Sequence, residues 1–257
     1  MGWTLFTQDG VLFIFRFIHF FFGVIWIGLL YYFNFVQGSF FAETDAHTKS
    51  GCIQKLVPRA LWWFRWGAMF TFLSGLFLIL LTLHFSGGFG LLASGWGVMI
   101  LTGALLGTLM WGNVWFVIWP KQKIVIQSAI QMAQGGQALP EAAAAAAQAG
   151  LASRTNTMFS MPMLFMMGAA RHLALSVPEG ASLLFAALIV IGIVLILELN
   201  SFFGKQGPLK SIPGVITCGV VLTAVLYSAI EITIRLYANV YPSSRAQRGD
   251  PNTKVLV

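Results

Sequence analysis

Three arginines lie inside long apolar segments, where a charged side chain is costly. Arg16, Arg171 and Arg235 each fall near one end of such a segment. A charge at membrane depth costs several kcal/mol, and such residues usually mark a functional site. Arg16 lies within one helical turn of His19, and Arg171 is directly followed by His172. Cations beside two possible iron ligands predict a buried haem whose carboxylates are held by arginine.

Composition assigns the chain to the membrane. It has 257 residues, of which 58% are hydrophobic and 9% charged, and its mean hydropathy is +0.80. Soluble domains carry about 25% charged residues. The net charge of +7 is spread over connections between apolar segments, so it reflects membrane topology rather than nucleic-acid binding. The two cysteines form no CxxC or CxxCH motif, which argues against zinc and covalently attached haem c.

Six apolar segments are long enough to cross a bilayer as helices, which takes roughly 20 residues. We predict an all-α fold, a polytopic membrane helical bundle of about six transmembrane helices over residues 1–241, with a polar C-terminal tail at 242–257. The longest connection, 120–155, contains an amphipathic stretch and a short alanine-rich helix framed by Pro140 and Gly150. The predicted spans are 11–36, 62–84, 96–119, 156–177, 182–203 and 213–240.

The distribution of Lys and Arg predicts the orientation. These residues gather in the connections 37–61, 120–155 and 204–212, which are therefore predicted to be cytoplasmic. Both termini then lie on the outer, periplasmic side, and the chain is a multi-pass protein of a bacterial inner membrane. The three arginines inside the spans map to the outer half, against this rule. Something other than topology is expected to hold them there.

Two histidines are the predicted axial ligands of a b-type haem. Helical arithmetic places His19 roughly 12 Å and His172 roughly 8 Å below the outer ends of their spans. Each has a glycine four positions away towards the cytoplasm, Gly23 and Gly168, which leaves room for a flat macrocycle. Haem propionates would point outward to the three arginines. The alternative is that the polar face of the first span only packs against other helices.

Three further residues leave alternatives open. His84 ends the second span and is either an interfacial histidine or a substitute haem ligand. Glu231 precedes Arg235 by four residues, the favourable order for a helical ion pair, so it either neutralises this arginine or leaves it free for a propionate. Glu198 lies in the inner part of the fifth span and is either a proton relay or an acid near the interface.

Four segments, 31–37, 65–68, 110–123 and 153–157, carry a resemblance to a known family. Over most of its length, up to about residue 240, the chain resembles the membrane domain of the bacterial membrane-bound urate oxidase (urate hydroxylase) family, called the urate oxidase N-terminal domain. The most specific segment reads Met110-Trp111-Gly112-Asn113-Val114-Trp115-Phe116-Val117-Ile118-Trp119-Pro120-Lys121-Gln122-Lys123.

The resemblance implies oxidation of urate coupled to electron transfer. In this family a C-terminal cytochrome c typically follows the membrane domain and takes up the electrons. Here sixteen residues follow Tyr241 and none forms a CxxCH motif. A separate cytochrome c, or another acceptor on the outer face, is therefore the expected partner, besides membrane lipids and possible further subunits.

Two hypotheses assign the chain to different classes of protein. The first is an enzyme, a haem b urate dehydrogenase that binds its planar, anionic substrate near the cytoplasmic ends of the spans. Its candidate substrate ligands are Asn34, Gln37, Asn113 and Asn156, with Gln122, Arg154 and an aromatic wall from Trp111 or Trp115 nearby. The same amides could instead bond between helices. The second hypothesis is a non-catalytic, haem-binding or structural subunit of a larger respiratory complex.

Overall fold

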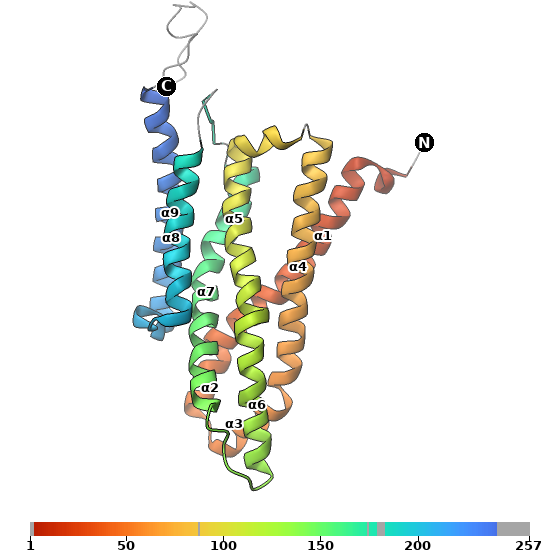
Figure 1. Cartoon of the computed structure of the whole chain (residues 1–257). Coiled ribbons are helices and arrows are strands. Elements are labelled where there is room, and N and C mark those ends of the chain that lie inside the picture. Colours follow the sequence, from red (N-terminus) through yellow and green to blue (C-terminus); the bar gives the residue numbers. More distant parts are fainter. Residues whose placement is uncertain (1–2, 87, 174, 179–182, 241–257) are drawn as a thin grey trace, which may run out of the picture.

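The structure is a bundle of long helices that run along one common direction (Figure 1). It is a computed structural model that describes residues 3–86, 88–173, 175–178 and 183–240. No strand occurs among these residues, which confirms the predicted all-α class. The predicted polar tail at 242–257 lies outside them. We call the end where α4, α7 and α9 finish the terminal end, and the end formed by α2, α3 and the α6–α7 connection the basal end.

The first half of the chain forms two long antiparallel helices. After the short η1 (Thr4–Phe6), α1 (Gln8–Tyr31) starts at Thr7, whose side chain accepts from the Gly10 amide. The helical path continues through a π-helical segment, η2 (Tyr32–Gln37), into α2 (Gly38–Glu43). The basal helix α3 (Ala46–Lys55) is capped by Asp45, and α4 (Val57–Phe85) returns along α1 with a proline in its first turn.

The next long helical path also contains a π-helical segment. After η3 (Phe89–Ala93), α5 (Gly95–Gly112) is capped by Ser94 and passes through a second π-helical segment, η4 (Asn113–Ile118). It continues as α6 (Trp119–Ala133), so the helical path is longer than the predicted span at 96–119. The amphipathic part of the predicted 120–155 connection therefore belongs to this helix. Polar residues continue the helix below the apolar segment.

The central helix, α7 (Ala142–His172), corrects the prediction of a separate alanine-rich helix. Gly150 was expected just past the end of that helix, but it lies inside α7. A glycine in a helix interior costs about 1 kcal/mol relative to alanine. Packing of α7 against α5, α6, α8 and α9 outweighs this cost. The expected helical end at 177 is also wrong, since α7 stops at His172 and residues 175–178 are not helical.

Two helices close the bundle beside α7. They are α8 (Leu184–Phe203) and α9 (Ile212–Val240), joined through η5 (Gly207–Lys210). Among the described residues, five helical stretches are long and apolar enough to cross a membrane. These stretches are Gln8–Glu43, Val57–Phe85, Gly95–Ala133, Leu184–Phe203 and Ile212–Tyr237. The predicted fourth span, 156–177, corresponds to α7, which is not among the five because its buried face carries small polar residues.

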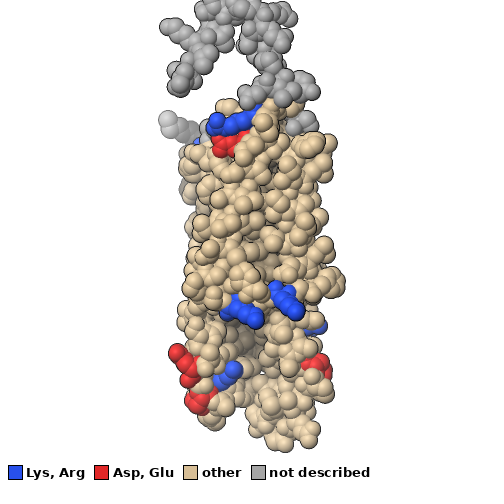
Figure 2. Space-filling model, turned by 90° about the vertical axis from the view of Figure 1, so that its left-hand side faces the viewer, with Lys and Arg blue, Asp and Glu red and all other residues tan. Residues whose placement is uncertain are grey.

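The surface agrees with a chain that contacts lipid. On the face shown in Figure 2, a broad band without charged side chains separates those near the terminal end from those in the lower part. The beginning of α1 and the end of α9 lie at the same end of the bundle (Figure 1). The band without charged side chains is expected of a multi-pass membrane protein. The assignment of the terminal end to the outer side stays a prediction.

Close packing of α5 against α7 depends on Gly103. A Cβ atom at this position would lie 2.8 Å from Cγ of Met167, whereas a Cβ at Gly112 on the same helix would meet nothing within 4 Å. We therefore expect Gly103→Leu to lower the free energy of unfolding by ~1–3 kcal/mol relative to Gly112→Leu, because overpacking forces the helices apart. Unfolding of both variants in detergent micelles measures this difference. Equal midpoints would contradict the close α5–α7 contact.

Candidate functional site

A polar cavity lies in the basal half of the bundle. Its volume is about 230 Å³. Its walls come from η2, the start of α4, the junction of η4 with α6, one face of α7, and Gln206 after α8. The polar residues that line it are Asn34, Gln37, Gln122, Ser153, Arg154 and Gln206. Most of the predicted basal amide set therefore converges on one cavity.

Both π-helical segments border this cavity. Asn34 and Gln37 lie in η2, and Ile118 ends η4. A π-helical turn inserts an extra residue into a helix, which rotates the side chains that follow, and such turns are frequent at functional sites. Asn34 is buried, and its Nδ2 donates to the Leu30 carbonyl at 2.9 Å and to Ser153 Oγ at 2.8 Å. This side chain therefore links η2 to α7 at the cavity wall.

A second group of polar side chains lies deeper in the bundle. Asn113 Nδ2 donates to Asn156 Oδ1 at 2.9 Å and to Glu198 Oε2 at 3.3 Å. Asn156 Nδ2 in turn donates to the Met110 carbonyl at 2.9 Å. All three polar residues are buried, and none of them is among those that line the cavity. Asn113 and Asn156, which were predicted as substrate ligands, therefore bond between helices, as the alternative interpretation required.

Arg154 supplies a positive charge at the cavity. Its Nη1 donates to the carbonyls of Leu209 and Lys210 at 2.8 and 3.0 Å, so it ties α7 to η5. Within the described part of the chain no carboxylate forms an ion pair with it. The guanidinium is therefore held in place by neutral groups. An anionic ligand in the cavity would meet an uncompensated cation.

The aromatic wall of the cavity differs from the prediction. Trp111 stacks on Phe72 with ring centroids 4.4 Å apart, and Trp115 contacts Trp66 at 5.5 Å, so neither lines the cavity. Instead Phe33 and Phe64 line it, with their rings 5.4 Å apart and nearly perpendicular. Trp111 and Trp115 were expected nearby because they lie at the same end of the spans as the amides. Their contacts with Phe72 and Trp66 hold them elsewhere.

His19 is held against α4 in the terminal half. Its Nδ1 lies 2.9 Å from the Thr71 carbonyl oxygen, so this nitrogen carries the proton and donates. The ring also lies over Gly75, where a Cβ atom would come within 2.9 Å of the imidazole. Metal-binding histidines commonly donate one ring N–H to a backbone carbonyl and bind through the other nitrogen. The predicted Gly23 faces Thr71 instead, and Gly75 was missed because it lies on another helix.

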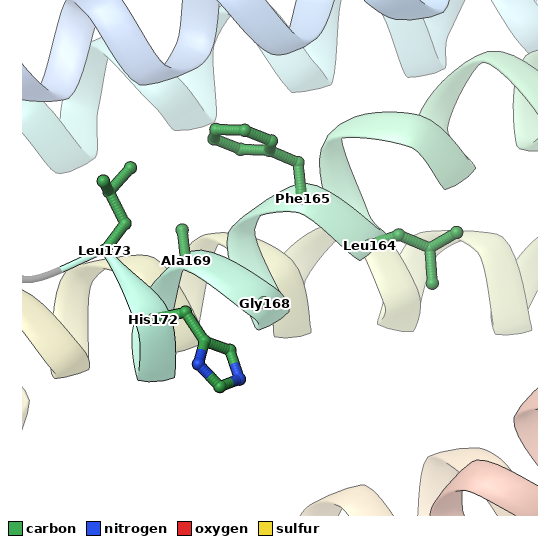
Figure 3. A pocket seen from close by; sticks show the side chains of 6 residues that line it. All are labelled: Leu164, Phe165, Gly168, Ala169, His172 and Leu173. Carbon is green, nitrogen blue, oxygen red and sulfur yellow. The ribbon is translucent and has the colours of Figure 1, made fainter.

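His172 lies in a shallow surface depression at the end of α7. Gly168, His172 and four apolar neighbours line it, and the imidazole points away from Phe165 and Leu173 (Figure 3). Gly168 lines the same depression as His172, and a Cβ atom at this glycine would meet nothing within 4 Å. The predicted match in depth stays a prediction. His172 is the last residue of α7, whereas His19 lies about three turns inside α1.

The charged residues of the terminal half have different surroundings. Arg235 donates through Nε to Glu231 Oε1 at 3.0 Å and forms an ion pair with it, so the expected neutralising pair is present. Arg16 and Arg171 are exposed on the bundle surface. His84 is exposed at the end of α4, beside the Phe85 ring. The assignment of the three arginines to haem propionates stays a prediction.

These features define the class of protein as a multi-helix membrane protein with a cation-bearing polar cavity in one half of its bundle. The sequence model of the urate oxidase N-terminal family matches residues 87–231, more than half of the chain. The chain therefore belongs to this family. No curated protein and no solved structure matches it. The matched segment contains Gln122, Ser153 and Arg154 of the cavity, while Asn34 and His19 precede it.

Asn156 holds α5, η4 and α7 together, which gives a test of the deeper polar group. We expect Asn156→Leu to lower the free energy of unfolding by ~1–3 kcal/mol, because it removes the side-chain bonds that Asn156 makes to the Met110 carbonyl and to the Asn113 amide inside the bundle. Asn200→Leu on α8 is the control, since Asn200 is exposed and makes one long bond to the Lys205 carbonyl. Chemical unfolding in micelles compares the two variants. An equal loss of unfolding free energy in both variants would show that the Asn156 hydrogen bonds do not stabilise the bundle.

Proposed function

We propose that the chain binds urate in the basal cavity and oxidises it, with the electrons leaving towards the terminal end. The observation that carries the proposal is the convergence of Asn34, Gln37, Gln122 and Arg154 on one cavity in a member of this family. Urate is a small, planar anion with amide-like donors and acceptors around its rim. Side-chain amides can pair with that rim, and Arg154 can offset the charge.

The size and walls of the cavity support a small aromatic ligand. Drug-sized ligands occupy pockets of roughly 300–1,000 Å³, and the cavity of about 230 Å³ lies just below that range. The rings of Phe33 and Phe64 provide an apolar surface for a planar ring system. The remaining wall combines polar side chains with apolar residues such as Val57, Leu61 and Ile118. This combination matches a bicyclic purine better than a long apolar molecule.

Oxidation of urate needs an electron acceptor, and we propose a b-type haem held by His19 and His172. Haem would supply a one-electron redox centre in the terminal half. The bond between His19 Nδ1 and the Thr71 carbonyl supports His19 as a ligand, since it fixes the ring and leaves Nε2 free. His172 and Gly168 share an open depression. We further propose an inner-membrane location, with the terminal end outside, where a separate cytochrome c takes the electrons.

The haem assignment predicts spectra of the purified protein. We expect a Soret band and, after dithionite addition, the α band of reduced haem b. His19→Ala and His172→Ala each remove a ligand and should abolish or shift these bands. His47→Ala is the control, because His47 is exposed on the basal helix α3. Unchanged spectra in both ligand variants would rule out this ligand pair.

The cavity predicts how urate binding responds to the loss of one amide. We expect Gln122→Leu to weaken urate binding by about tenfold or more, since a hydrogen bond to a charged ligand contributes ~1.5–3 kcal/mol. The control is Gln127→Leu, five positions along α6 and exposed. Titration calorimetry on protein in lipid nanodiscs measures both. Equal urate affinity of the two variants would contradict the proposal that urate binds in this cavity.

Anaerobic addition of urate separates an enzyme from a subunit without catalytic activity. We expect urate to reduce the haem if the chain oxidises it. A haem spectrum that urate leaves unchanged, in a protein that co-purifies with large partners, would instead support a haem-binding subunit of a larger complex.

A further inference from the structure

Glu198 is a buried acid without a cationic partner. It lies on α8 with 6% of its surface exposed, and Asn113 Nδ2 donates to it at 3.3 Å. Over the described ranges of the chain, no Lys, Arg or His forms an ion pair with it. A buried carboxylate that has lost its hydration and has no counter-charge is strongly disfavoured. The Glu198 side chain must therefore carry a proton or hold a bound cation.

The helices around Glu198 offer no charge that could replace the missing partner. It is the only ionisable side chain of α8, and α5 and η4 contain none. On α7, Arg154 donates to the carbonyls that follow α8, while Arg171 and His172 lie at the terminal end. On the described part of α9, the ionisable residues are Cys218, Tyr227, Glu231, Arg235 and Tyr237, with Glu231 and Arg235 paired to each other.

Three buried oxygen atoms, on α8 and on the segments that pack against it or bond to Glu198, have no hydrogen-bond partner. They are Asn113 Oδ1, Thr155 Oγ1 and Ser201 Oγ, on residues whose exposed fractions are 1%, 0% and 2%. Asn113 contacts Glu198 directly, and Ser201 lies one turn further along the same buried face of α8. Thr155 precedes Asn156 on α7, which packs against α8. Unpartnered buried oxygens are rare, and grouped ones indicate ordered water.

Along the chain, the two hydroxyl groups lie close to residues of the cavity. Thr155 directly follows Arg154, and Ser201 lies between Glu198 and Gln206 along the chain. Both Arg154 and Gln206 line the cavity. Hydroxyl groups can donate and accept at once, so with water between them they can pass a proton along.

We propose that Glu198 is a proton-binding site of the bundle, hydrated through Asn113, Thr155 and Ser201, and that its proton exchanges with the basal cavity. The proton removes the uncompensated charge, and ordered water satisfies the remaining oxygens. The site is independent of urate and of haem. Its test therefore uses neither ligand, and its failure leaves the proposed function untouched.

Infrared spectroscopy of the full chain in lipid nanodiscs at neutral pH tests the protonation. We expect a C=O stretching band of a protonated carboxyl that disappears in Glu198→Gln. The band should persist in Glu141→Gln, because Glu141 is exposed before α7. Gln has the shape of a neutral Glu, so Glu198→Gln should keep the unfolding midpoint of the native chain. Identical native and Glu198→Gln spectra would overturn the proposal.

A sodium titration distinguishes a proton from a bound cation. If the site holds a cation, sodium chloride should raise the unfolding midpoint of the native chain but not that of Glu198→Gln, with choline chloride as the control salt. That result would overturn the proposal. Equal responses of the two proteins to both salts support proton binding.

Exchange into D₂O tests the path to the cavity. We expect the Glu198 band to shift severalfold more slowly in Thr155→Val/Ser201→Ala than in the native chain. Thr102→Val is the matched control, since Thr102 is buried on α5 and bonds to the Val98 carbonyl. The single variant Ser201→Ala repeats the measurement if the double variant unfolds. Native exchange rates in these variants would overturn the proposed path.

Discussion

Polar groups inside an apolar bundle must bond to one another, because lipid offers them no partner. This constraint makes α7 the centre of the structure. Ser153 accepts from Asn34 of η2, Ser160 bonds to Tyr31 of α1, and Asn156 bonds to Met110 and Asn113 on the α5–η4 path. Arg154 ties the same helix to η5. Each of these bonds fixes a different neighbour, so the polar side chains of α7 set the arrangement of the helices around it.

The cavity follows from that arrangement. Asn34 and Asn113 each lie in a π-helical segment and are buried by their bonds to α7 or its neighbours. The extra residue in each segment turns the following side chains, so that Gln37 and Ile118 reach the cavity wall. The same polar bonds that hold the helices therefore shape the space between them. Asn34 and Arg154 therefore both line the cavity and hold neighbouring elements together. The deeper amides of Asn113 and Asn156 bond between helices and stabilise the bundle.

Parts of the site were readable from the sequence because they depend on local composition. The basal gathering of amides, the cation of Arg154 and the helical pair of Glu231 with Arg235 follow from spacing along single helices. The contacts of His19 with Thr71 and Gly75 were not readable, since they join residues more than fifty positions apart. Ser153 was also missed as a cavity residue. Its only local signal was its place in a polar segment of an otherwise apolar chain.

The sequence by itself determined the class of the fold, because hydropathy and helix length act on each segment separately. It also placed the basic residues of the three basal connections at one end of the spans and identified the family. Only the tertiary structure decided that α7 extends from Ala142 to His172 and is buried despite its low hydropathy. It also decided which amides face the cavity and which bond to other helices. The reason is that packing between helices, and the π-helical turns that it accommodates, override the regular periodicity on which sequence interpretation depends.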